Sequence, residues 1–99
     1  MIPIMKIGKI LAGEYKDWLI TIMPDENNCF VVPYWSQEYP LGFDDYYLSY
    51  ADLEESIDDY HVEWTDEDYE DYRRRTHRAK PTSEQVREAF LKHVEKYRK

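Results

Sequence analysis

The sequence predicts an α+β fold, in which a small antiparallel sheet of about three strands is followed by about three helices. Short apolar segments separated by turn residues fill the first 35 residues, and apolar residues recur at helical spacing in much of the rest. With 99 residues, 42% of them hydrophobic, the chain is long enough for one core and too short for two. We therefore expect a single domain over residues 1–99, made of a β-meander (1–35), an acidic loop and helix (36–64) and a helical C-terminal part (65–99).

Three strand-like segments predict the meander. Residues 6–12 and 17–23 are apolar-rich and are separated by four residues, which indicates a hairpin. The second segment is apolar on both faces and should be central in its sheet. A cluster of turn residues then precedes a third strand over residues 29–34. Pro33 lacks the N–H that a strand ladder needs, so we expect this strand to lie at an edge or to end there.

A first amphipathic helix is predicted after a loop over residues 36–45. Ser49 is a plausible start signal, although its capping box has Asp52 in place of Glu or Gln. Residues 61–64 then alternate briefly between apolar and polar, which indicates a short strand. The helix is predicted from apolar residues at spacings of four, three, four and three: Tyr46, Tyr50, Leu53, Ile57 and Tyr60.

Two further helices are expected in the C-terminal part. The first covers residues 66–79, with acidic residues in its first turns and arginines in its last, as the helix dipole favours. Its expected salt bridges join residues four apart: Glu70 with Arg74, and Asp71 with Arg75. The second helix begins with a Thr82–Gln85 capping box. One apolar stripe follows: Val86, Ala89, Phe90, His93, Val94 and Tyr97.

Charge is strongly polarised along the chain. Residues 1–72 contain three basic and 18 acidic residues, which gives a net charge of −15, while residues 73–99 give +7. No Lys or Arg occurs among the 56 residues from Asp17 to Tyr72, which contain 17 acidic residues. A field of this sign attracts basic surfaces and accelerates their association.

The first predicted helix concentrates this negative charge on one face. Opposite its apolar stripe lie five carboxylates, which form a predicted acidic ridge: Asp52, Glu54, Glu55, Asp58 and Asp59. Tyrosine and tryptophan are the residues that anchor protein interfaces. The candidate partner-binding residues are therefore Asp44, Asp45, Tyr46, Tyr47, Asp52, Glu55, Asp58, Asp59 and Trp64. In the alternative interpretation, the acidic face is only solvated and the tyrosines belong to the core and its rim.

The sequence favours a binding or inhibitor protein for a basic macromolecule over an enzyme. It has no nucleophile elbow, no glycine-rich phosphate loop, no HExxH and no CxxC, so no catalytic residue or cofactor is assigned. His93 lies on an apolar stripe and is expected to be a core residue. Metal binding is disfavoured, because the acidic clusters lack the spacing and central glycine of an EF-hand loop: Asp44 with Asp45, and Asp66 with Glu67 and Asp68.

The basic C-terminal part has three interpretations. Its arginines and lysines have the charge to contact nucleic-acid phosphates, but helix-dipole and side-chain pairing explain many of them, and the acidic body opposes DNA. Nucleic acid is therefore a disfavoured partner. Alternatively, the basic part pairs with the acidic body of another copy, which would make a self-associating structural or regulatory protein, or it folds back on its own body.

Cysteine usage and hydropathy predict a cytoplasmic location without a membrane contact. The single cysteine, Cys29, cannot form an internal disulfide, and its apolar neighbours predict a buried thiol in a reducing compartment. The apolar N-terminus is interrupted by lysines, and no segment approaches the about 18 consecutive apolar residues of a membrane span.

Several segments together resemble small acidic α+β immunity proteins of bacterial toxin systems. These are a hairpin with Asp17 and Trp18, the sequence GFDDYY at Gly42–Tyr47, an acidic amphipathic helix and the sequence HVEW at His61–Trp64. The resemblance covers residues 13–64 and implies a dedicated inhibitor that covers the substrate-binding face of a basic toxin, often a nuclease. Phage-encoded inhibitors that imitate DNA with rows of carboxylates would have the same signature.

Overall fold

The computed structural model describes residues 2–97, including the side chains of residues 2–96. It has an α+β fold in one compact unit, as predicted, and its described part contains one antiparallel sheet and three α-helices. The sheet is larger than predicted, with six strands: β1 (Lys6–Ile10), β2 (Leu19–Ile20), β3 (Met23–Pro24), β4 (Phe30–Trp35), β5 (Phe43–Tyr47) and β6 (Val62–Asp68). The helices are α1 (Tyr50–Ile57), α2 (Tyr69–Thr76) and α3 (Ser83–Tyr97), and two 3-10 turns are η1 (Glu26–Asn28) and η2 (Asp58–Tyr60).

Strand β4 lies inside the sheet. It pairs with β5 on one side and with β2 and β3 on the other, and β1 and β6 follow beyond β2. Strands β2 and β3 pair with β4 in the same register. Two residues, 21 and 22, separate β2 from β3, and the position opposite Pro33 lies among them. The Thr21 N–H still donates to the Pro33 carbonyl at 3.1 Å. The prediction of an edge or a strand end at Pro33 is therefore wrong, because a proline without its N–H removes one ladder bond and keeps its acceptor.

Two strands depart from the predicted elements. Residues 43–47 form β5, although the sequence assigned them to a loop and the start of a helix. The helix α1 begins only at Tyr50, with the Asp52 N–H donating to Ser49 Oγ at 3.1 Å, which confirms the predicted cap. Strand β6 is confirmed but extends to Asp68, so α2 begins at Tyr69 and not at residue 66.

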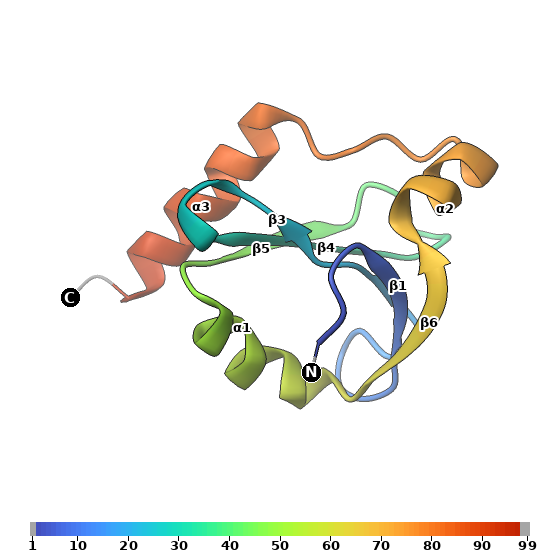
Figure 1. The fold of residues 1–99 in the computed structure, drawn as a ribbon, viewed down its shortest axis with the longest axis horizontal. Coiled ribbons are helices and arrows are strands. Elements are labelled where there is room, and N and C mark those ends of the chain that lie inside the picture. Colours follow the sequence, from blue (N-terminus) through green and yellow to red (C-terminus); the bar gives the residue numbers. More distant parts are fainter. Residues whose placement is uncertain (1, 98–99) are drawn as a thin grey trace.

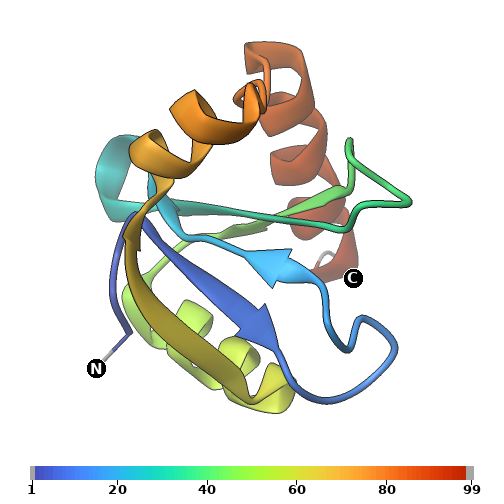
Figure 2. The same ribbon diagram turned by 90° about the vertical axis from the view of Figure 1, so that its right-hand side faces the viewer.

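Helices cover both faces of the sheet. Helix α1 lies against one face, and α2 and α3 lie against the other (Figures 1 and 2). The core under α1 contains eight buried residues: Ile10, Ile20, Ile22, Val32, Tyr34, Tyr47, Leu53 and Ile57. On the opposite face, two smaller clusters lie under α2 (Ile7, Trp35, Tyr69) and α3 (Val31, Tyr46, Ala89). This double coverage explains why both faces of β4 are apolar.

The last helix has the predicted start and a partly buried stripe. The Gln85 N–H donates to Thr82 Oγ1 at 3.1 Å and the Thr82 N–H donates to Gln85 Oε1 at 2.7 Å, which confirms the capping box. Along the stripe, Ala89 and His93 are buried, while Phe90 and Val94 remain over a third exposed. The side chain of Tyr97, also placed on this stripe, lies outside the described residues. None of the described helices is long and apolar enough to cross a membrane.

Candidate functional site

The basic side chains around α2 pair with carboxylates of the same chain. The predicted pairs four residues apart are absent, because Arg73 and Arg74 pair with carboxylates three residues before them and Arg75 reaches Glu67 in β6. The observed ion pairs are Arg73–Glu70 (3.0 Å), Arg74–Asp71 (2.9 Å), Arg75–Glu67 (2.9 Å) and Lys80–Glu70 (2.9 Å). These pairs are local, between residues 67 and 80, so they bear out the side-chain pairing that the sequence suggested for many of these basic residues.

Arg78 connects the segment between α2 and α3 to the loop over residues 36–42. Its guanidinium carbon lies 3.8 Å from the centroid of the Trp35 ring, and its Nη1 donates to the Pro40 carbonyl. Arg73 Nε in turn donates to the Arg78 carbonyl at 3.1 Å. This basic residue therefore stabilises a loop, which is a structural role that requires no external anion.

The acidic face of α1 forms as predicted, with one exception. Asp52 turns towards α3, where its Oδ2 lies 3.4 Å from His93 Nε2. The other four carboxylates, Glu54 and Glu55 on α1 and Asp58 and Asp59 in η2, are exposed, and we call them the α1 ridge. Among the residues that the structure describes, none of these four forms an ion pair. Leu53 and Ile57 on the opposite side of the helix are buried and hold the ridge on the surface.

The tyrosines predicted to anchor a partner lie inside the protein. Tyr46 and Tyr47 are 6% and 7% exposed, because alternate residues of β5 face the cores under α3 and α1. Trp64 is half-buried, and its ring occupies the space that a Cβ at Gly8 would need. Tyr46 and Tyr47 are therefore core residues, and Trp64 covers the β1–β6 pair.

Asp44 and Asp45 are adjacent in β5 and so point to opposite faces of the sheet. Both are partly buried, and desolvation raises the pKa of each carboxyl above its ordinary value. For Asp45, Lys96, His93 and Lys92 on α3 oppose this effect. No group of three or more His, Cys, Asp or Glu side chains that could hold a metal ion occurs among the described residues.

A cavity of about 460 Å³ opens beside Asp45. Its walls come from the β1–β2 loop, from β5, from the end of α1 with η2, and from α3: Ala12, Gly13, Glu14, Tyr15, Asp44, Asp45, Tyr46, Tyr47, Ser56, Asp59, Tyr60, Ala89, Lys92, His93 and Lys96. Burial and the nearby Asp45 raise the pKa of Tyr60 to about 12, so its hydroxyl stays protonated at neutral pH. Asp59 belongs to the α1 ridge and also lines this cavity, so the ridge and the cavity are adjacent. The lining offers carboxylates, ammonium groups and phenolic donors, which suits binding of a polar or charged group.

Asp45→Asn is expected to raise the free energy of unfolding at pH 7. Because the folded-state pKa of Asp45 is raised, protonation stabilises the native protein fully below the unfolded pKa, and this stabilisation is lost as the pH rises through the folded pKa. The gain from Asp45→Asn should therefore shrink as the pH falls through the raised folded-state pKa and should be lost below the unfolded value of about 4. Urea unfolding at pH 7 and pH 3.5 measures this change in the free energy of unfolding. Asp59→Asn, an exposed residue from the same cavity, is the control. A wild type that is more stable than Asp45→Asn at pH 7 would show that attraction by Lys96 and Lys92 outweighs desolvation.

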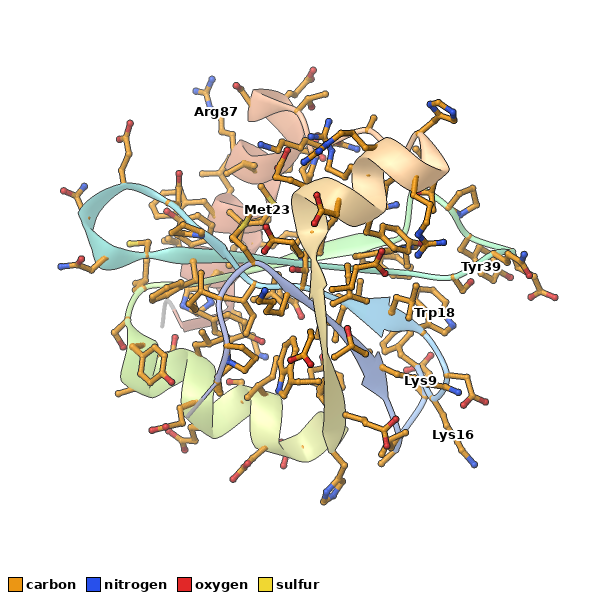
Figure 3. The ribbon with its side chains drawn as sticks, turned by 45° about the vertical axis from the view of Figure 1, so that its right-hand side comes forward. Lys9, Lys16, Trp18, Met23, Tyr39 and Arg87 are labelled. Atoms are coloured by element: carbon orange, nitrogen blue, oxygen red, sulfur yellow. The ribbon has the colours of Figure 1, made fainter. Side chains whose placement is uncertain are left out.

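Four aromatic rings from different loops and strands form a second surface, which sequence reasoning missed. Trp18 stacks with Tyr39 (centroids 5.7 Å apart, planes at 24°) and with Phe43 (5.9 Å, 8°), and Tyr15 meets Trp18 edge-on at 4.8 Å. We call these four residues the aromatic cluster. Tyr39 is 58% exposed and Phe43 is 48% exposed, and Figure 3 shows Tyr39 beside Trp18. The only sequence signal was the unusual density of aromatic residues in turn segments.

Comparison with known proteins identifies no relative. No protein-family model matches the sequence, and neither a curated protein nor a solved structure is significantly similar to it. The likeness to acidic immunity proteins therefore remains a hypothesis based on the sequence.

Proposed function

We propose that this chain is a non-enzymatic binding protein that uses the α1 ridge to inhibit a basic macromolecule such as a nuclease or a toxin. The observation that carries the proposal is the contrast between two sets of carboxylates. Those near α2 are paired with arginines and Lys80, whereas the four ridge carboxylates are exposed and unpaired in the described part of the chain.

The ridge is unfavourable for the helix that carries it. Glu54 and Glu55 on α1 are followed by Asp58 and Asp59 in η2, and like charges gathered on one short segment repel one another. Asp58 and Asp59 also lie at the C-terminal end of α1, where the helix dipole disfavours negative charge and where no basic residue compensates. Local stability therefore does not explain the ridge, which supports a role in the recognition of a basic surface.

The proposed inhibitor would cover a surface that normally binds an anionic substrate. Nucleases and similar toxins present such basic surfaces, and the resemblance to immunity proteins supports this class of partner. Self-association through the basic part is a weaker candidate, because the arginines of α2 are already paired within the chain.

Affinity capture from a lysate of the native host tests the proposal. The baits are the wild-type chain and a ridge variant, Glu55→Lys with Asp58→Lys and Asp59→Lys. The matched control variant is Glu26→Lys with Glu88→Lys and Glu95→Lys, three exposed residues outside α1 that give the same net charge. We expect a basic protein on the wild-type and control baits, eluted by salt and missing from the ridge bait. Equal capture by all three baits, or no salt-eluted protein on any of them, would contradict the proposal.

A further inference from the structure

The cavity beside Asp45 is lined at its base by packed side chains. Its volume of about 460 Å³ lies within the range of about 300–1,000 Å³ that is usual for small-molecule sites. Among its lining residues, Tyr46, Tyr47 and Ala89 are at most 7% exposed. The Tyr47 ring also meets the buried His93 ring edge-on, with the centroids 5.9 Å apart. The base of the cavity is therefore formed before any ligand arrives, so binding requires little ordering of these side chains.

The exposed charges of the lining are divided by sign between different elements. Glu14 belongs to the β1–β2 loop and Asp59 to η2, whereas Lys92 belongs to α3. Figure 2 shows the β1–β2 loop (blue) and the end of α1 (yellow-green) below α3 (red). Within residues 2–96, none of these three side chains forms an ion pair. The cavity therefore presents an acidic side, Glu14 and Asp59, and a basic side on α3.

The charges deeper in the cavity are largely matched to one another. Desolvation raises the pKa of the partly buried Asp45. Lys96 opposes this rise more than His93 or Lys92 does. Lys92 is also the weaker of the two cations that oppose the rise at Asp44. Because Lys92 contributes least to both carboxyls, its ammonium group is the cation of the lining that is best placed to serve a ligand.

We propose that the cavity binds a small zwitterion with an ammonium group and a carboxylate at opposite ends of an apolar linker, such as an ω-amino acid. Glu14 and Asp59 accept hydrogen bonds from the ammonium group, and Lys92 donates to the carboxylate. The rings of Tyr15 and Tyr60, which also line the cavity, contact the linker. A ligand with a single charge is repelled by one of the two sides. The site goes beyond the proposed function because it requires no basic macromolecule.

Titration of the ¹⁵N-labelled full chain with ε-aminocaproate, a six-carbon ω-amino acid, tests this site at pH 7 and constant ionic strength. The three glycine amide signals are the readout, because Gly13 lines the cavity, whereas Gly8 lies in β1 and Gly42 directly precedes β5. We expect the Gly13 signal to shift saturably with a Kd of about 1 mM, since so small a ligand binds modestly. The other two signals should stay in place. Hexylamine and hexanoate, which each lack one charged end, should bind about fivefold more weakly or worse.

Single exposed substitutions separate the two ends of the ligand. Lys92→Gln should weaken ε-aminocaproate about fivefold without weakening hexylamine. Glu14→Gln should weaken ε-aminocaproate and hexylamine about threefold without weakening hexanoate. The matched controls are Lys16→Gln and Glu26→Gln, two exposed residues outside the lining, which should leave all three affinities unchanged. Asp59 is left intact in every variant, because it also belongs to the α1 ridge.

Three results would overturn the proposal. They are equal affinity of ε-aminocaproate and either singly charged analogue, an affinity that Lys92→Gln does not change, and no saturable shift of the Gly13 signal up to about 20 mM ligand. None of them would affect the proposed function, because affinity capture by the α1 ridge uses no small molecule. Conversely, a ridge without a basic partner would leave the titration result standing.

Discussion

Leu53→Ala is expected to lower the free energy of unfolding by about 2–5 kcal/mol, the usual cost of removing a large side chain from a packed core. Leu53 is fully buried and attaches α1 to the sheet. Total stabilities of small domains are about 5–15 kcal/mol, so this variant should unfold at a much lower urea concentration. The measurement is the urea midpoint followed by circular dichroism.

The neighbouring substitution Glu54→Ala is the matched control. Glu54 lies on the same helix but is exposed, so its replacement should change the stability by less than about 0.5 kcal/mol. Urea midpoints that fall equally in the two variants would show that α1 does not attach through its apolar face, and the position of the ridge would then be wrong.

Local signals predicted the elements that depend on local interactions. The Ser49 cap and the Thr82–Gln85 capping box rest on residues close in sequence, and the structure confirms them. The hairpin of the first two segments also forms, but residues 11–18 connect its strands in place of the predicted four residues, and the second segment is divided between β2 and β3. Strand β5 was missed because its pattern of two aspartates and two tyrosines shows no alternation. Its conformation depends on pairing with β4, and pairing is not visible locally.

The candidate site was predictable where helical periodicity determined it. The spacing of Leu53 and Ile57 correctly placed Glu54 and Glu55 on the solvent face of α1, and Asp58 and Asp59, which are also exposed, lie in η2. Asp52 differs because α3, distant in sequence, places His93 against it. The aromatic cluster and the pairing of the basic residues also depend on contacts between separate elements. The sequence therefore shows that these residues are aromatic or basic, but it does not show which residues of other elements they contact.

Reversing three ridge charges is expected to slow association with the basic partner about tenfold or more at low salt. The change is Glu55→Lys with Asp58→Lys and Asp59→Lys. Loss of long-range attraction lowers the association rate, whereas the dissociation rate should change less. The folded state should not suffer, because lysine near the C-terminal end of α1 suits the helix dipole. Stopped-flow or surface-based kinetics with the captured partner measure both rates.

The dependence of the association rate on ionic strength tests the role of the ridge most directly. Wild type, the ridge variant and the control variant Glu26→Lys with Glu88→Lys and Glu95→Lys are compared from about 20 mM to 300 mM salt, a range over which exposed charges become screened. Both variants change the formal net charge from −8 to −2, so total charge cannot separate them. We expect a steep fall of the rate with salt for wild type and control, and a nearly flat line for the ridge variant. The same slope for both variants would show that net charge, and not the α1 ridge, attracts the partner.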